Sequence, residues 1–185
     1  MNIIELESWE DGFIDFRWVS VARSTAMDRL ILNSIHIEVD PEDESKMCIV
    51  ATNGKRIHMA RRKTNFATGN YLVVKSTEKE FLAVESDLDG LHYPSFRQIF
   101  PDYKPEDLRE IHIPPEENSE LRRFLIATNF HDLQKAHFNL SFLCEAAEGL
   151  SSLYIFQRDE TEPILVQDCP GKYSRIAMVM PCRKD

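Results

Sequence analysis

The chain contains 185 residues, of which 43% are hydrophobic and 29% are charged, and its formal net charge is −9. This composition is that of an ordinary globular protein and excludes a disordered or fibrous chain. The negative charge argues against a protein that coats nucleic acid indiscriminately, because phosphate binding needs an electropositive face. Basic residues confined to one surface stay compatible with this charge.

Targeting signals and paired cysteines are missing from the sequence. No apolar run approaches the ~18–20 residues that a membrane-spanning helix needs. The opening residues lack the basic-then-apolar layout of a secretion signal. We therefore expect a cytoplasmic protein. Its four cysteines form no C-x-x-C pair, so reduced thiols are expected.

Hydrophobic periodicity predicts a helix followed by a meander in the first half. Residues 16–28 place Trp18, Val21 and Ala22 on one helical face. Gly54 stands where a tight turn between two strands needs a positive φ. Near alternation of apolar and polar residues predicts strands at residues 30–39, 47–52, 56–61, 71–75 and 80–84.

The second half is expected to repeat this order. Asn139 is a good N-cap for a helix at residues 139–148, and Gly149 stands where a left-handed C-terminal residue belongs. Extended or mixed structure is expected at residues 121–130. Strands are expected at residues 110–114, 153–158, 163–168 and 175–181. A helix followed by three strands therefore occurs twice.

Motifs for catalysis and for metal binding are missing from the sequence. It contains no G-x-x-x-x-G-K-[ST], H-E-x-x-H or G-x-S-x-G segment. The six histidines show no metal-ligand spacing. His36 and His58 could meet across adjacent strands, but buried or surface histidines are commoner than ligands. We therefore expect no catalytic residue, no metal and no cofactor.

Four segments together resemble one protein family. Residues 29–34 read R-L-I-L-N-S, residues 51–59 read A-T-N-G-K-R-I-H-M, residues 89–97 read D-G-L-H-Y-P-S-F-R, and residues 179–183 read V-M-P-C-R. In the same order they resemble the bacterial DNA polymerase III β sliding clamp, with its A-T-D-G-H-R-L turn, its D-G-x-F-P-x-Y-R segment and its V-V-M-P-M-R tail.

This resemblance implies an α+β processivity (DNA clamp) fold. Antiparallel sheets would carry two helices packed on one side, in two helix-plus-meander halves. The resemblance covers parts of the clamp's middle and third domains and leaves out the whole first domain. Residues 1–185 are expected to form a single composite domain, in which residues 1–101 resemble the middle domain and residues 102–185 resemble the third.

In the clamp family these segments line a groove that grips short peptide tails of polymerases and repair proteins. Lys55, Gln98 and Cys182 depart from the family's histidine, arginine and methionine, so the polar rim differs while the apolar floor is kept. An apolar strand residue could equally belong to an ordinary core. The resemblance assigns to the groove Leu32, Thr52, Gly54, Lys55, Arg56, Ile57, Pro94, Gln98, Ile99, Met178, Met180, Pro181 and Cys182.

The resemblance predicts a clamp-like, non-enzymatic protein that binds clamp-binding peptides of DNA polymerase or other replication and repair proteins. One alternative is a non-encircling adaptor or decoy that competes for clamp partners, and another is a small ligand-binding protein or enzyme on the same scaffold. A ring around duplex DNA would need a homo-oligomer, because one domain cannot encircle a duplex. DNA contact would then fall on Arg17 and Arg23, whose charges equally suit a solvated surface.

Overall fold

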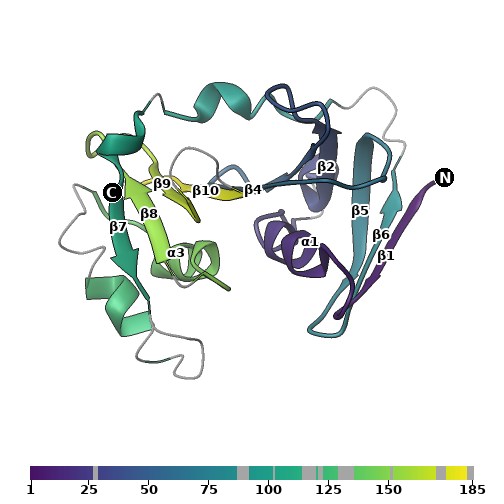
Figure 1. Ribbon diagram of the computed structural model, residues 1–185, viewed down its shortest axis with the longest axis horizontal. Helices are drawn as coiled ribbons and strands as arrows, with labels where there is room; N and C mark the ends of the chain where they lie inside the picture. The colour runs from purple at the N-terminus through teal and green to yellow at the C-terminus, as the bar shows by residue number, and fades with distance from the viewer. Residues whose placement is uncertain are drawn as a thin grey trace. The chain divides into compact units, whose positions relative to one another are not determined.

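A computed structural model describes residues 1–26, 29–86, 92–101, 103–113, 120, 123–128, 136–150, 152–169 and 174–182. The chain divides into two compact units, Met1–Phe96 and Arg97–Asp185. Figure 1 labels most of their helices and strands. Within the described part of the chain, no helix is long and apolar enough to cross a membrane. The unit boundary lies close to the division predicted after residue 101, and the single composite domain stays a prediction.

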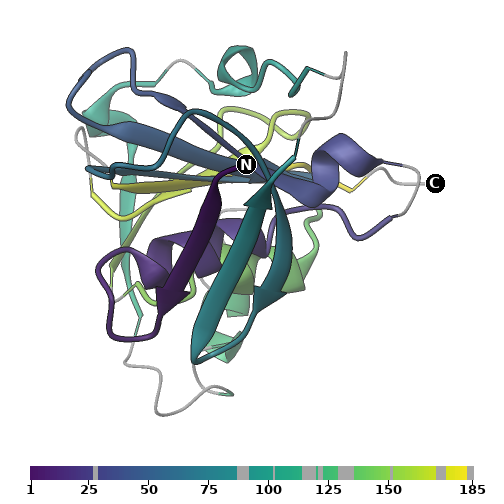
Figure 2. The same cartoon turned by 90° about the vertical axis from the view of Figure 1, so that its right-hand side faces the viewer.

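The first unit is built on one antiparallel sheet. Its strands lie in the order β1-β6-β5-β2-β3-β4, and Figure 2 shows β1, β6 and β5 side by side. Its elements are β1 (Ile3–Glu7), α1 (Phe13–Ser20), the 3₁₀ helix η1 (Leu30–Asn33), β2 (Ser34–Val39), β3 (Met47–Thr52), β4 (Arg56–Arg62), β5 (Gly69–Ser76) and β6 (Glu80–Glu85).

Helix α1 packs on the apolar face of this sheet. It contacts β2, β3, β4, β5 and β6. The buried ring of Phe16 lies 5.4 Å from the ring of Phe66 and 5.5 Å from the ring of Phe81. A fully buried side chain of this size contributes roughly 1.5–3 kcal/mol. Because a helix of 8 residues is not stable alone, packing holds α1 in place.

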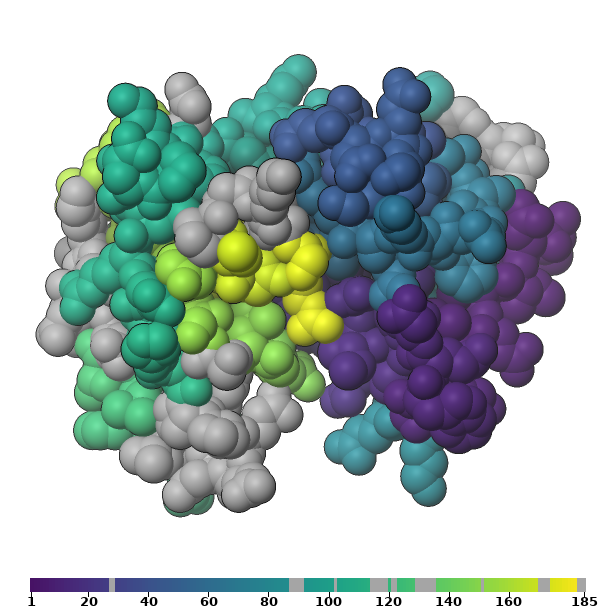
Figure 3. Space-filling model, viewed as in Figure 1, coloured from purple at the N-terminus to yellow at the C-terminus, as the bar shows by residue number. Residues whose placement is uncertain are grey.

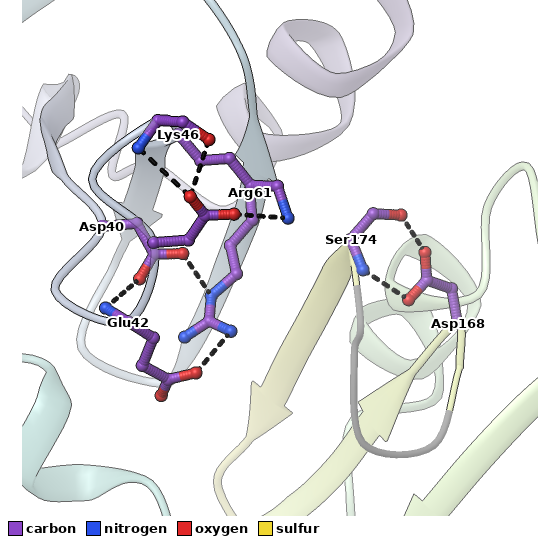
Figure 4. Close-up of polar contacts among 8 residues, drawn as sticks. Asp40, Glu42, Lys46, Arg61, Asp168 and Ser174 are labelled. Carbon is purple, nitrogen blue, oxygen red and sulfur yellow. Dashed lines mark hydrogen bonds and ion pairs between the residues drawn. The ribbon is translucent and has the colours of Figure 1, made fainter.

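A buried ion pair fixes the connection between β2 and β3 (Figure 4). Asp40 is 1% exposed, and its carboxylate lies 3.2 Å from Nε of Arg61 on β4. The other carboxylate oxygen of Asp40 accepts a hydrogen bond from the backbone N–H of Glu42 at 3.1 Å. Removing one member of a buried pair leaves an uncompensated charge, so this contact favours one register for the three strands.

The second unit contains a smaller antiparallel sheet, in the order β10-β9-β8-β7. Ser174 precedes β10 and Asp168 follows β9. The backbone N–H of Ser174 donates to the Asp168 carboxylate at 3.0 Å, which links the ends of the two strands (Figure 4). Residues 123–128 are helical. Its other elements are η2 (Arg97–Ile99), η3 (Pro105–Asp107), β7 (Arg109–His112), α3 (Leu140–Ala146), β8 (Ser152–Phe156), β9 (Ile164–Gln167) and β10 (Arg175–Val179).

The predicted fold class is confirmed. Helix α1 precedes the meander β2-β3-β4, and helix α3 precedes the meander β8-β9-β10. The side chain of Asn139 caps α3 by accepting a hydrogen bond from the backbone N–H of Ser141 at 2.9 Å. Gly54 and Gly149 have φ values of 82° and 74°, as predicted. The first three residues of the segment 89–97, which carries part of the resemblance, lie outside the described residues.

Several predicted boundaries were wrong. Helix α1 spans Phe13–Ser20 rather than the predicted residues 16–28, and the Arg23 side chain donates to the carbonyl of Ser20 at 2.8 Å just beyond the helix end. Residues 30–33 form a 3₁₀ turn before the strand begins, and residues 123–128 are helical where extended or mixed structure was expected. Strand β1 was not predicted.

Candidate peptide-binding site

The turn between β3 and β4 is held by its own side chains. The Thr52 hydroxyl donates to the carbonyl of Arg56 at 2.7 Å and accepts from the N–H of Gly54 at 3.0 Å. The Asn53 side-chain oxygen accepts from the N–H groups of Lys55 and Arg56 at 2.9 and 3.1 Å. Such local bonds replace the ladder where the chain reverses. The turn is therefore rigid, and its exposed tip presents Gly54 and Lys55.

Arg56 links this turn to helix α1. Its side chain is 7% exposed, and its Nη2 donates to the carbonyl of Val21, the C-cap residue of α1. A cation at this position satisfies an orphan carbonyl and interacts favourably with the negative end of the helix. Burial lowers the pKa of Arg56 to about 10. Arg56 therefore stabilises the fold, whatever it contributes to binding.

Leu32 and Pro94 are two further site residues predicted in the first unit. Leu32 lies in η1, is half-buried, and its carbonyl accepts from the N–H of Ser24 at 2.7 Å. Pro94 is exposed. It follows Tyr93, whose ring stacks on His36 with a centroid separation of 4.8 Å. Burial raises the pKa of the Tyr93 hydroxyl. Both predicted residues are therefore reached from solvent and held by ordered neighbours.

Most of the remaining site residues belong to the second unit. Gln98 and Ile99 lie in η2 and are exposed. Met180 follows β10 and is 37% exposed, and Pro181 is half-buried. The N–H of Cys182 donates to the carbonyl of His137 at 2.7 Å, which fixes the backbone of the exposed segment. In Figure 3 the last described stretch of the chain, coloured yellow, reaches the surface.

Two of the predicted groove residues are core side chains. Ile57 is 5% exposed and Met178 is 1% exposed, so most of their surface already contacts other protein atoms. Leu32, Ile99 and Met180 are the accessible apolar members of the predicted set. Residues 52–57 come together at the first unit's turn, and residues 178–182 are contiguous in the second unit. The meeting of the two sets in one groove stays a prediction.

The predicted DNA contacts, Arg17 and Arg23, stay a prediction. Arg17 is half-buried on α1. Arg23 donates to the carbonyl of Ser20, and burial lowers the pKa of its guanidinium. The carboxylate of Asp15 on the same helix lies 2.7 Å from Arg62. Helix α3 carries no lysine or arginine, so α1 and α3 offer few cations to a phosphate backbone.

No metal centre is formed by the residues that the structure describes, since they contain no group of three or more histidine, cysteine or acidic side chains. His36 lies opposite Val50, and Val50 lies opposite Met59. Because neighbouring strand residues point to opposite faces, His36 and His58 point away from each other. The pair that could have met across adjacent strands cannot share an ion.

The described elements define an α+β protein of antiparallel sheets with a helix-and-meander arrangement in each unit. No protein-family model matches the chain, and no curated protein is similar to it in sequence. Solved structures do resemble it, among them bacterial DNA polymerase III β subunits.

The β subunit of the Streptococcus pyogenes DNA polymerase is similar with a TM-score of 0.62 and 14% identity, over 100% of this chain and 66% of that one. The Bacillus subtilis sliding clamp has a TM-score of 0.63 and 13% identity, over 100% and 65%. The Bartonella birtlesii clamp, bound to griselimycin, has a TM-score of 0.61 and 14% identity, over 98% and 66%. The chain thus has the sliding clamp fold and spans just under two thirds of these clamps.

Proposed function

We propose that this chain is a non-catalytic, clamp-like protein that captures short apolar tails of DNA polymerase or of other replication and repair proteins. The rigid turn at residues 52–56 carries this proposal, because a tail that arrives unstructured needs a surface that is already ordered. The sliding clamp fold supports it. So does the accessibility of Leu32, Ile99 and Met180.

Binding of this kind would be weak and exchangeable. Each buried leucine or phenylalanine anchor contributes roughly 1.5–3 kcal/mol. Association and ordering of the tail cost about 4–15 kcal/mol. Two or three anchors contribute roughly 3–9 kcal/mol, so any surplus over this cost is small, which suits partners that take turns on one surface. Met180 adds a flexible thioether, and such side chains adapt to different apolar partners.

The test uses a fluorescently labelled polymerase tail peptide with leucine and phenylalanine anchors, and the same peptide with both anchors replaced by alanine. Anisotropy titrations with the whole chain should show saturable binding of the first peptide alone. Leu32→Ala and Met180→Ala should each weaken it about tenfold, which corresponds to about 1.4 kcal/mol. Val39→Ala and Phe124→Ala remove apolar side chains that are 45% and 62% exposed outside the predicted groove, and they should change nothing. Equal losses in all four variants would refute the groove.

A non-encircling adaptor or decoy is the second candidate. The few cations of α1 and α3 favour it, because a ring that slides on DNA needs an electropositive lining. Sedimentation velocity gives the oligomeric state, and retention on circular duplex DNA at low salt tests encirclement. The adaptor version expects peptide binding without retention on DNA. A closed oligomer that stays on circular DNA and leaves on linearisation would instead establish the processivity version.

A further inference from the structure

A pocket of about 380 Å³ lies in the second unit, at one end of its sheet. None of the residues around it was singled out by the sequence, because they come from three separate stretches of the chain. Two arginines, a carboxylate and an amide surround an apolar floor. The lining includes Asp107, Arg109, Ile155, Gln157, Arg158 and Ile164.

Strand pairing explains why these residues meet. Arg109 on β7 lies directly opposite Ile155 on β8, and Ile155 lies opposite Val166 on β9. A step of two residues along each strand returns to the same face, which aligns Gln157 with Ile164. Ile155 and Ile164 are 3% and 1% exposed. The pocket therefore lies at the end of the sheet, where the apolar core of the unit ends and polar side chains surround it.

The charged side chains around the pocket differ in whether other protein groups already bind them. The Asp107 carboxylate accepts the backbone N–H of Lys104 at 2.9 Å and closes η3. Arg158 is 52% exposed, and its Nη1 lies 3.4 Å from the carboxylate of Glu162. The side chain of Arg109 is exposed and makes no hydrogen bond or ion pair with any residue in the described part of the chain. One guanidinium beside an apolar floor is thus available to a ligand.

We infer that this pocket binds a small apolar carboxylate, with the carboxylate on Arg109 and the alkyl or aryl group over the floor. Guanidinium and carboxylate match in a bidentate geometry. The volume falls within the range of about 300–1,000 Å³ that is usual for small-molecule sites. A phosphate dianion suits the pocket less well, because its second charge would face the carboxylates of Asp107 and Glu162. The site is independent of the peptide groove.

Such a carboxylate could belong to a free organic acid or to the C-terminus of a polypeptide that ends in an apolar residue. Two probes separate these sources. Hexanoate represents the free acid, and N-acetyl-leucine represents the chain end. N-acetyl-leucinamide has the same alkyl group without the charge and is the matched control. Titration of the whole, isotopically labelled chain by amide NMR locates each probe.

Saturable shifts in β7, β8 and β9 with a carboxylate, and at least fivefold weaker binding of the amide, are the expected result. Tighter binding of hexanoate would point to a free acid, and tighter binding of N-acetyl-leucine to a chain end. Arg109→Gln should weaken the carboxylate about tenfold. Arg123→Gln removes an exposed arginine that does not line the pocket, and it should leave the affinity unchanged.

Three outcomes would overturn the inference. The first is the absence of saturable shifts up to the solubility limit of both acids. The second is equal binding of acid and amide. The third is equal weakening by Arg109→Gln and Arg123→Gln, which would mean that the overall charge, rather than one guanidinium, attracts the anion. Unchanged amide spectra of the two variants before titration establish that both remain folded.

Discussion

His58 makes the stability of the first unit depend on pH. Its ring is fully buried on β4 and stacks on Trp18, with ring centroids 4.3 Å apart. Its Nδ1 lies 2.9 Å from the carbonyl of Trp18. Because a carbonyl only accepts, Nδ1 carries the proton of a neutral imidazole. The buried Nε2 has no hydrogen-bond partner among the described residues, so protonation would place an unsatisfied charged N–H inside the core.

Burial lowers the pKa of His58 to about 3, and the neighbouring charge of Arg56 lowers it further against the opposing bond to the Trp18 carbonyl. The unfolded chain has a histidine pKa of about 6.5. Below that pH the unfolded chain takes up a proton that the folded chain refuses. Stability is therefore complete above about pH 6.5 and is lost as pH falls toward 3. The loss of stability is at most about 1.4 kcal/mol per pH unit. Because this slope applies only below about pH 6.5, the loss between pH 7 and pH 5 is about 2 kcal/mol.

The assay is urea unfolding followed by tryptophan fluorescence. Both tryptophans, Trp9 and Trp18, belong to the first unit, so the signal reports that unit. His58→Phe keeps an aromatic ring against Trp18 and removes the titrating group. Between pH 7 and pH 5 the unsubstituted chain should lose about 2 kcal/mol more than this variant. His112→Phe changes an exposed histidine of the second unit and serves as the control. Equal pH dependence of all three proteins would refute the buried neutral histidine.

Three further substitutions follow from local geometry. Gly12→Ala should destabilise the first unit by about 1–3 kcal/mol, because Gly12 has φ of 94° and an added Cβ would overlap the guanidinium of Arg62. Gly54→Ala is the matched comparison, because its backbone is strained in the same way but the atom nearest to its added Cβ is 3.7 Å away. Thermal unfolding of both variants therefore separates the steric clash from the backbone strain. Arg56→Met should cost about 1–3 kcal/mol by orphaning the α1 carbonyl, and unchanged urea midpoints would contradict this. Asn139→Ala should lower the stability of the second unit by about 1 kcal/mol, measured by circular dichroism, and no loss would mean that packing alone sets the start of α3.

Strand positions could be predicted because their side chains alternate or because a turn residue stands between them. Gly54 with its positive φ separates β3 from β4, and both strands were predicted within one residue. The end of α1 could not be predicted. The sequence after Ser20 keeps a helical pattern, and the helix ends where Arg23 and Arg56 occupy the last carbonyls. Arg56 comes from a distant strand, so no local rule contains that information.

In the candidate site, too, the features set by neighbouring residues could be predicted and those set by tertiary packing could not. The hydrogen bonds of the β3–β4 turn follow from Thr52 and Asn53, whose side chains bond to backbone groups a few residues away. The burial of an apolar side chain does not follow from such local hydrogen-bonding rules. In β10, residues 176–179 are buried on both faces of the strand. The sequence therefore has no alternation of apolar and polar residues that would distinguish Met178 from Met180. One is core and the other is 37% exposed. Tertiary packing decides which apolar residue can meet a ligand.

Burial also decides which substitution can test the groove. Arg56 belongs to the segment that carries the family resemblance, but it is 7% exposed and bonded to Val21 at the end of α1. Loss of peptide binding in an Arg56→Ala variant would therefore follow equally from a displaced helix end and from a missing contact. Met180 makes no such contribution to a helix end and is accessible. A loss of affinity in Met180→Ala, without a change in urea midpoint, separates binding from stability in a way that no substitution of Arg56 can.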